Sequence, residues 1–227
     1  DVITLGGVGN FSATDLPKVL AGKKVHVYPY VGNYSEGMSG SCSPKDLETM
    51  MQLIYLYFTA PRADEEAFQS YAQRNKAALE NQELNPMITF SDSLVKVMYN
   101  NHPLRMRMKA EDIDKIDYAK SMELYKDRFN DPNNFIFYFV GNIDEDAFKP
   151  LVEQYLASLK KNKRKESWKD INLSIPENDY ICKYEKDMQN PKATVYMIIN
   201  GTLEYSYRNQ LYMNALSDVM DIYYTRT

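Results

Sequence analysis

Hydrophobic positions along this chain follow two periods, the two-residue period of strands and the three-to-four-residue period of helices. Residues 24–31 alternate as a strand, with valines on one face and His26, Tyr28 and Tyr30 on the other. Pro29 lacks the N–H that a ladder requires, so this strand is expected at a sheet edge or at a bulge. Residues 34–41 are expected to form a second strand.

The helix predicted over residues 43–58 has a clear start signal. Ser43 can cap it, Pro44 has the φ angle of a first turn, and Asp46 can serve as the acid of a capping box. The same spacing predicts further helices over 64–80, 91–99, 118–129 and 144–159, and a last helix from Tyr207 to the end of the sequence.

The remaining apolar runs predict strands. Residues 135–140 are a continuous aromatic and β-branched run, which indicates a strand buried on both faces. Residues 180–186 and 193–200 are expected to be two more strands, joined through a turn at Asn190-Pro191. Because several helices follow one another between strands, the order favours an α+β fold over a doubly wound parallel sheet.

Composition excludes several classes of protein. The 227 residues hold 27 Lys and Arg against 31 Asp and Glu, and this net charge of −4 lacks the signature of general nucleic-acid binding. The longest apolar run, residues 135–140, is too short to span a membrane. Two cysteines, Cys42 and Cys182, exclude a disulfide-rich scaffold. The basic run at 160–165 is interpreted as a solvated linker, because it lacks the aromatic platform of a phosphate- or nucleic-acid-binding patch.

Neither end of the sequence resembles a natural boundary. No secretory signal pattern opens it. The helical pattern that begins at Tyr207 reaches Thr227 without a glycine cap or a proline stop. We therefore expect a piece of a longer polypeptide, whose targeting signals, if any, lie elsewhere.

Catalytic zinc needs three protein ligands and an open position, and this chain has only two histidines. Neither His26 nor His102 lies in an H-E-x-x-H or H-x-x-E-H pattern, so neither has a partner at helical spacing. A mixed site formed by His26 and Cys42 is left open by the sequence. The simpler interpretation is that His26 stands on the polar face of a strand and that His102 precedes a turn proline.

Motifs for other chemistry are incomplete. Residues 37–41 miss the last glycine of the G-x-S-x-G nucleophile elbow, and pairs of Cys42 with either histidine lack a local signature. Residues 7–12 resemble a dinucleotide fingerprint with Ser12 at its third glycine, but the acid expected about twenty residues later is missing from Val27–Val31. We therefore assign no catalytic residue and no metal ligand, and the substrate-binding residues are unknown.

Several segments resemble the pitrilysin/insulinase-type zinc metallopeptidases. Ser43-Pro44-Lys45-Asp46-Leu47-Glu48-Thr49, followed by residues 52–62, is similar to one segment of that family. Residues 6–12 before it, and Val140-Gly141-Asn142-Ile143-Asp144 before the last helix of a repeat, are similar to two others. The likeness covers most of residues 1–160 in the family's order, and residues 178–227 more weakly.

The resemblance implies tandem homologous α+β domains, each with a mixed, mainly antiparallel sheet and helices packed on one face. These domains form two halves that close around peptides, and only one half carries the H-x-x-E-H zinc motif. This chain resembles the half without it. Residues 1–160 would be the third of four domains, lacking its opening strands, residues 161–179 a linker, and residues 180–227 the opening strand–strand–helix unit of the next domain.

No residue here matches the family's zinc ligands or its general-base glutamate. Glu80 lies on a helix comparable to the one that supplies the third ligand in the active domain, and without the histidines it is expected to be a solvated acid. The Arg/Tyr substrate motif of the last domain would lie beyond Thr227. The resemblance thus implies no cofactor in this chain and zinc in the catalytic half of the parent protein.

The implied function is a non-catalytic, chamber-forming domain that encloses the peptide substrates of a zinc metalloendopeptidase and is inert in isolation. Enclosure excludes solvent and limits substrate size. The alternative is a structural or protein-interaction relative without peptidase activity, which an upstream H-x-x-E-H motif would argue against. A stand-alone binding module is disfavoured by the open-ended last helix. The family resemblance suggests that the parent protein is located in the bacterial periplasm or cell envelope.

The expected partners are the catalytic half of the same polypeptide and peptide substrates, with no nucleic acid and no membrane span. Residues 180–227 are expected to dock where the opening strands would lie, because an open apolar sheet edge needs a partner. The docked segment can belong to the same chain or to a second copy in a swapped homodimer.

Overall fold

The computed structural model describes residues 2–162, 166–176, 180–187 and 190–225. The chain folds into α1 (Leu16–Val19), β1 (Val25–Val31), β2 (Glu36–Cys42), α2 (Leu47–Thr59), α3 (Glu65–Glu83), α4 (Pro86–Met98), α5 (Ala110–Ile113), α6 (Tyr118–Arg128), α7 (Glu145–Leu151) and α8 (Tyr207–Thr225). Short 3-10 turns precede α2, α5 and α7 and open the chain at Val2–Thr4. No helix in the described ranges is long and apolar enough to cross a membrane.

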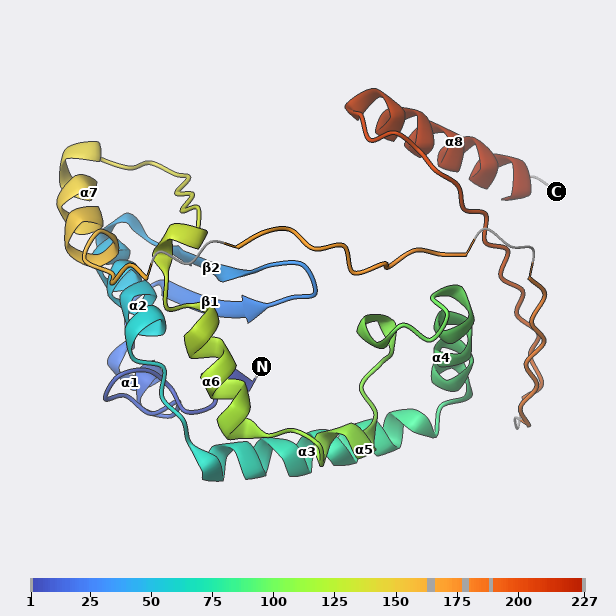
Figure 1. Cartoon of the computed structure of the whole chain (residues 1–227), viewed down its shortest axis with the longest axis horizontal. Coiled ribbons are helices and arrows are strands. Elements are labelled where there is room, and N and C mark those ends of the chain that lie inside the picture. Colours follow the sequence, from blue (N-terminus) through green and yellow to red (C-terminus); the bar gives the residue numbers. More distant parts are fainter. Residues whose placement is uncertain (1, 163–165, 177–179, 188–189, 226–227) are drawn as a thin grey trace.

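The predicted α+β class is confirmed. Strands β1 and β2 form an antiparallel hairpin whose register runs from Val25 opposite Cys42 to Val31 opposite Glu36. Helix α2 packs against the hairpin, and α7 lies beside α2 (Figure 1). The predicted alternation of β1 also holds, since Val27 is buried while His26, Tyr28 and Tyr30 are exposed.

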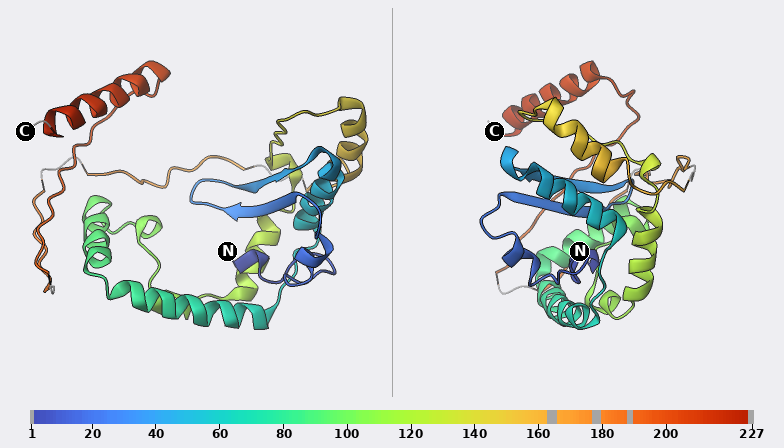
Figure 2. Two further views of the ribbon diagram at one scale, coloured as in Figure 1. Left: turned by 180° about the vertical axis from the view of Figure 1, so that it is seen from behind. Right: turned by 90° about the vertical axis from the view of Figure 1, so that its left-hand side faces the viewer.

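The main core lies between α2, the hairpin and the end of the α7 region. Its fully or nearly buried side chains include Val8, Val27, Met51, Leu53 and Leu156. A second, smaller cluster, built on Phe68, Tyr118 and Met122, fixes α6 to the first turn of α3. From there α3 extends away from the core as an arm; α5 lies along its second half, and α4 follows at its far end (Figures 1 and 2).

The segment predicted as a strand buried on both faces, residues 135–140, is different in the structure. Its phenylalanines point inward, and the ring of Phe58 lies 5.1 Å from Phe135 and 6.0 Å from Phe137. Ile136, Tyr138 and Val140 are exposed. Within the described residues the segment forms no ladder with another strand, so only one of its faces is covered. When every residue of a run is apolar, the sequence does not show which face of the segment will be left uncovered.

Residues 180–186 and 193–200, predicted as strands, are extended but belong to no sheet in the described ranges. They also do not dock at the hairpin edge, which corrects the predicted docking within one chain. They lie beside α4 instead (Figure 1), where Tyr184 and Tyr196 contact Phe90. The final helix is confirmed as α8, and all of its described side chains from Leu211 to Tyr224 are exposed.

The starts of two helices depart from the prediction. Asp46 does not form a capping box with the backbone N–H of Ser43; its carboxylate accepts the Ser43 hydroxyl and the backbone N–H of Lys24. Helix α4 begins five residues before the predicted 91–99, because the side chain of Asn85 accepts the Met87 N–H and Pro86 occupies the first turn.

The helix predicted over 144–159 changes geometry part-way along. After α7 the chain continues as a π-helix over Val152–Leu156. Pro150 inside α7 has no N–H, so one regular hydrogen bond is missing just before the change. A wider turn of this kind is an ordinary way to accommodate such a gap.

Candidate functional site

The two histidines lie on separate elements. His26 is on the exposed face of β1, where either ring nitrogen lies within 3.4 Å of the Ser41 hydroxyl. His102 precedes the 3-10 turn Pro103–Arg105, and its Nδ1 accepts the backbone N–H of Leu104 at 3.3 Å. Its Nε2 therefore carries the proton that is donated to the carbonyl oxygen of Ile171 at 3.0 Å. Both nitrogens of His102 are thus engaged in holding the backbone.

The mixed site of His26 and Cys42 is not formed. The hairpin register pairs His26 with Ser41 and Val25 with Cys42. Because neighbouring residues of a strand point to opposite faces, the imidazole and the thiol lie on opposite sides of the hairpin. Burial, with a smaller effect of the nearby Asp46 carboxylate, raises the pKa of the Cys42 thiol. This environment disfavours the thiolate that metal binding and nucleophilic attack require.

The glycine-rich segment 6–12 is a structural turn. Gly9 donates its N–H to the carbonyl oxygen of Ala60 at 2.8 Å, and Gly7 accepts the N–H of Arg62. A Cβ on Gly6 would lie 2.1 Å from the Arg62 carbonyl oxygen. The glycines therefore let the backbone of residues 6–12 approach the backbone at the end of α2 closely. This use of glycine explains their spacing without a nucleotide.

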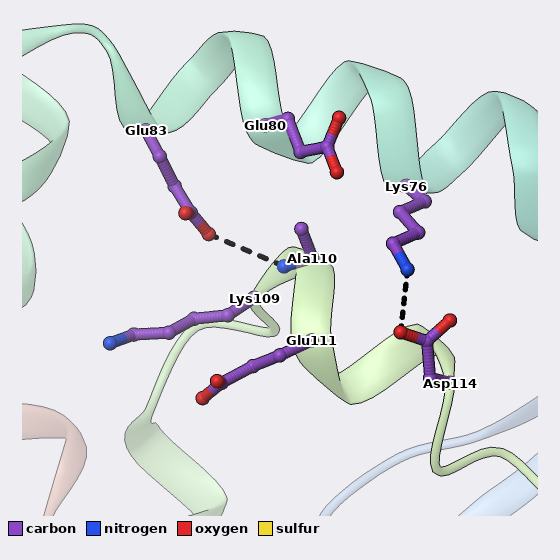
Figure 3. A pocket seen from close by; sticks show the side chains of 7 residues that line it. All are labelled: Lys76, Glu80, Glu83, Lys109, Ala110, Glu111 and Asp114. Atoms are coloured by element: carbon purple, nitrogen blue, oxygen red, sulfur yellow. Dashed lines mark hydrogen bonds and ion pairs between the residues drawn. The ribbon is translucent and has the colours of Figure 1, made fainter.

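A shallow, open groove of about 400 Å³ lies between the far half of α3 and the region of α5 (Figure 3). Its lining is almost entirely charged, formed by Lys76, Glu80, Glu83, Lys109, Ala110, Glu111 and Asp114.

Contacts across this groove neutralise much of its charge. Lys76 donates from Nζ to Asp114 at 2.5 Å, and this bond raises the pKa of Lys76. Glu83 accepts the N–H of Ala110 at 3.3 Å and lies 3.9 Å from Arg107. These contacts join α5 to α3, which is a structural function.

Glu80 lines this groove, on the same face of α3 as Lys76 one turn earlier (Figure 3). The charged residue one turn earlier on this face is thus an ammonium group, which cannot act as a zinc ligand. Across the described ranges, no three His, Cys, Asp or Glu side chains gather in a way that could hold a metal. The donor set does not fit the zinc of a peptidase, because its two imidazoles lie on separate elements and contact different partners.

Comparison with known proteins explains this arrangement. Residues 115–221 match the family model described as the peptidase M16 inactive domain. This segment, a little under half of the chain, is similar to the M16, or pitrilysin-type, peptidase family. The match includes α6, residues 135–140, α7 and most of α8, and it runs through the stretch 161–179 that the sequence analysis interprets as a linker.

Proteins similar to this chain are named as zinc proteases. A zinc protease PQQL-like protein of Arabidopsis thaliana is 30% identical over 117 residues, which are 51% of this chain and 12% of the relative. The probable zinc protease PqqL of Haemophilus influenzae is 19% identical over 219 residues, which are 96% of this chain and 23% of the relative. The chain thus spans between about an eighth and a quarter of the length of these relatives.

A solved structure shares the fold. The periplasmic protease PqqL from Escherichia coli superimposes with a TM-score of 0.64 at 21% identity, over 77% of this chain and 19% of that protein. The sequence resemblance to the pitrilysin-type family is thereby confirmed: residues 115–221 match the inactive domain of M16 peptidases, and the solved structure shares the fold.

Proposed function

We propose that this chain forms part of the non-catalytic half of a zinc metalloendopeptidase, where it helps to enclose peptide substrates. The observation that carries the proposal is the match of residues 115–221 to an inactive M16 domain, in a chain whose described His, Cys, Asp and Glu side chains form no cluster that could hold a metal. Zinc and the attacking water would belong to the catalytic half of the same polypeptide. An enclosing wall contributes by excluding solvent and by limiting substrate size, and it needs no metal of its own.

The proposed organisation keeps the boundaries drawn from the sequence. Residues 1–160 form one homologous domain, 161–179 a linker, and 180–227 the opening unit of the next domain. Support comes from the exposed apolar side of α8, where Leu211, Leu216, Val219 and Ile222 have no covering element among the described residues. An amphipathic helix with an uncovered apolar side is expected to pack against further chain.

The isolated chain is expected to be inert. Purified residues 1–227 should hold far less than one zinc ion per chain by mass spectrometry of the metal, and should not cleave quenched fluorogenic peptides. A His26→Ala, His102→Ala double variant is the matched control, since it should give the same zinc content and the same background. Stoichiometric zinc and hydrolysis that both disappear in the double variant would contradict the proposal.

The alternative parent is a family member with a structural or protein-interaction function and no peptidase activity. The coding sequence upstream separates the two, because H-x-x-E-H followed by a distal glutamate is required for the peptidase. If that motif is present, the full-length protein should cleave peptides in a zinc-dependent way. The name of the E. coli neighbour as a periplasmic protease supports a periplasmic or envelope location for such a parent.

A swapped homodimer of this chain stays a second proposal about its partners. The exposed side chains of Ile136, Tyr138 and Val140 favour it, because the uncovered apolar side of this extended segment can be covered by residues 180–227 of another copy. Light scattering of the purified chain measures this directly. A mass of one chain at all concentrations up to 100 µM or so would contradict the swapped dimer and leave the enclosing function unaffected.

A further inference from the structure

Helix α4 stands at the end of the α3 arm, away from the main core (Figures 1 and 2). It is amphipathic, yet none of its side chains is fully buried. Its apolar residues, among them Met87, Ile88, Phe90, Leu94 and Val95, are each partly covered. A helix with a strong apolar stripe and no core of its own is a surface for docking another segment.

The structure shows which segment lies on this surface. The ring of Phe90 has its centroid 6.0 Å from that of Tyr184 and 5.6 Å from that of Tyr196. Beside it, the hydroxyl of Tyr184 donates to Thr89 Oγ1 at 3.1 Å, and Lys186 Nζ donates to the same oxygen at 3.3 Å. One turn of α4 therefore contacts two extended segments that lie on either side of the turn at Asn190-Pro191.

The exposed fraction of the side chains along residues 195–199 alternates, which agrees with the contact between Tyr196 and Phe90. Tyr196 and Ile198 are 57% and 43% exposed, whereas Val195, Met197 and Ile199 are 90%, 78% and 79% exposed. A period of two is what a strand shows when one of its faces is covered. Here the covered face is the one that carries Tyr196, which contacts Phe90.

The chain that leads to this segment is also attached along its path. Arg128 Nη1 lies 3.1 Å from Glu166, and His102 Nε2 donates to the carbonyl oxygen of Ile171. His102 follows α4 by four residues, so its contact holds the connecting chain close to the same end of the arm. The described part of the linker thus contacts the end of α6 through Glu166 and the residues that follow α4 through Ile171.

We propose that α4 is the docking platform for residues 180–187 and 190–199 of the same chain, with Phe90 as its central residue, and that this contact orients the unit that follows. The occupant is this chain's own segment, which the structure places on the helix. In a protein built from successive domains, such a contact fixes the angle between one domain and the next. The inference concerns orientation, and it holds whether the parent is a peptidase or a structural relative.

Two spin labels can measure the docking in the full chain. In a Cys42→Ser background, the exposed Cys182 takes one label and Gln73→Cys, on the exposed side of α3, takes the other. Double electron–electron resonance should then give one narrow distance distribution. Removing an aromatic contact of this geometry should raise the undocked fraction about two- to tenfold.

Two variants on opposite sides of the contact are compared with a matched control. Phe90→Ala and Tyr196→Ala should each broaden the distribution, while Tyr205→Ala, which removes an exposed tyrosine nine residues away from Tyr196, should leave it unchanged. Circular dichroism checks that α4 remains helical in Phe90→Ala, and Tyr196→Ala does not touch that helix. A broad distribution in the unsubstituted chain, or equal distributions in all three variants, would overturn the proposal.

Discussion

The carboxylate of Asp46 accepts the backbone N–H of Lys24 at 2.9 Å, so a side chain at the start of α2 holds the residue before β1. The same carboxylate accepts the hydroxyl of Ser43. One buried acid therefore joins three consecutive features of the chain. These are the end of the loop after α1, the hairpin and the first helix of the core.

Asp46→Asn should lower the melting temperature. It should also make the melting temperature depend less on pH in the acid range. The Ser43 hydroxyl, followed by the Lys24 N–H, holds the pKa of Asp46 below its usual value in the folded chain. A lowered folded pKa contributes stability that is present above the ordinary carboxyl pKa and is lost as pH falls through the folded value. The wild-type chain should thus lose more thermal stability than the variant between pH 5 and pH 2 or so.

Differential scanning calorimetry across that pH range measures this effect. Asp218→Asn is the control, because Asp218 is an exposed acid of α8 whose change should leave the pH dependence as it is. Parallel pH profiles for wild type and Asp46→Asn would show that the bond to Lys24 contributes nothing to folding.

Tyr125→Phe should destabilise the domain by about 1–2 kcal/mol, because it leaves a buried carbonyl without its donor. The Tyr125 hydroxyl donates to the Tyr57 carbonyl oxygen at 2.9 Å, and burial raises the pKa of this phenol well above its usual value. The bond joins α6 to α2. Urea unfolding should show a lower midpoint with an unchanged slope.

Tyr138→Phe is the matched control for this change, since Tyr138 is exposed in residues 135–140. It should unfold at the same urea concentration as the wild-type chain. Equal midpoints for Tyr125→Phe and Tyr138→Phe would mean that the carbonyl of Tyr57 finds another donor.

Gly6→Ala should cost at least about 2 kcal/mol, as overpacking against rigid backbone does. The added methyl group would lie 2.1 Å from the carbonyl oxygen of Arg62, so the turn over residues 6–12 would have to move away from the end of α2. Gly201→Ala offers the matched control, because nothing lies within 4 Å of a Cβ at that position. Thermal unfolding should show a lower melting temperature for Gly6→Ala than for Gly201→Ala. An equal decrease in both variants would indicate a general effect of replacing glycine by alanine.

The sequence predicts the elements whose pattern is local. The alternation around Val27 indicates β1, and the stripe of α2, with Met51 and Ile54 on one side, indicates both the helix and its buried face. The absence of a zinc motif follows from two histidines and their neighbours alone. These inferences need only the period of the side chains and the residue types.

The rest depends on contacts between distant residues. Whether Phe135–Val140 is covered on one face or two depends on which elements lie beside it, and an apolar run is the same in both cases. The partner of Asp46 is Lys24, twenty-two residues earlier, so a rule for helix starts assigns the wrong donor. Phe90 meets Tyr184 and Tyr196 only after about one hundred residues of chain have folded back.

Arg128→Met should loosen the connecting chain while leaving the core almost as stable as before. Arg128 Nε lies 3.0 Å from Glu36 at the start of β2, and its Nη1 lies 3.1 Å from Glu166. Because the guanidinium is partly exposed, its loss should cost no more than about 1 kcal/mol of unfolding free energy. Amide exchange over residues 166–172 should nevertheless become faster, since the attachment of that stretch to the Arg128 guanidinium is gone. Salt near 0.5 M should produce part of the same change in the wild-type chain by screening the pair.

Lys126→Met removes an exposed charge from the same helix and should alter neither exchange nor its salt dependence. Unchanged exchange in Arg128→Met would show that the Arg128–Glu166 pair does not position the connecting chain.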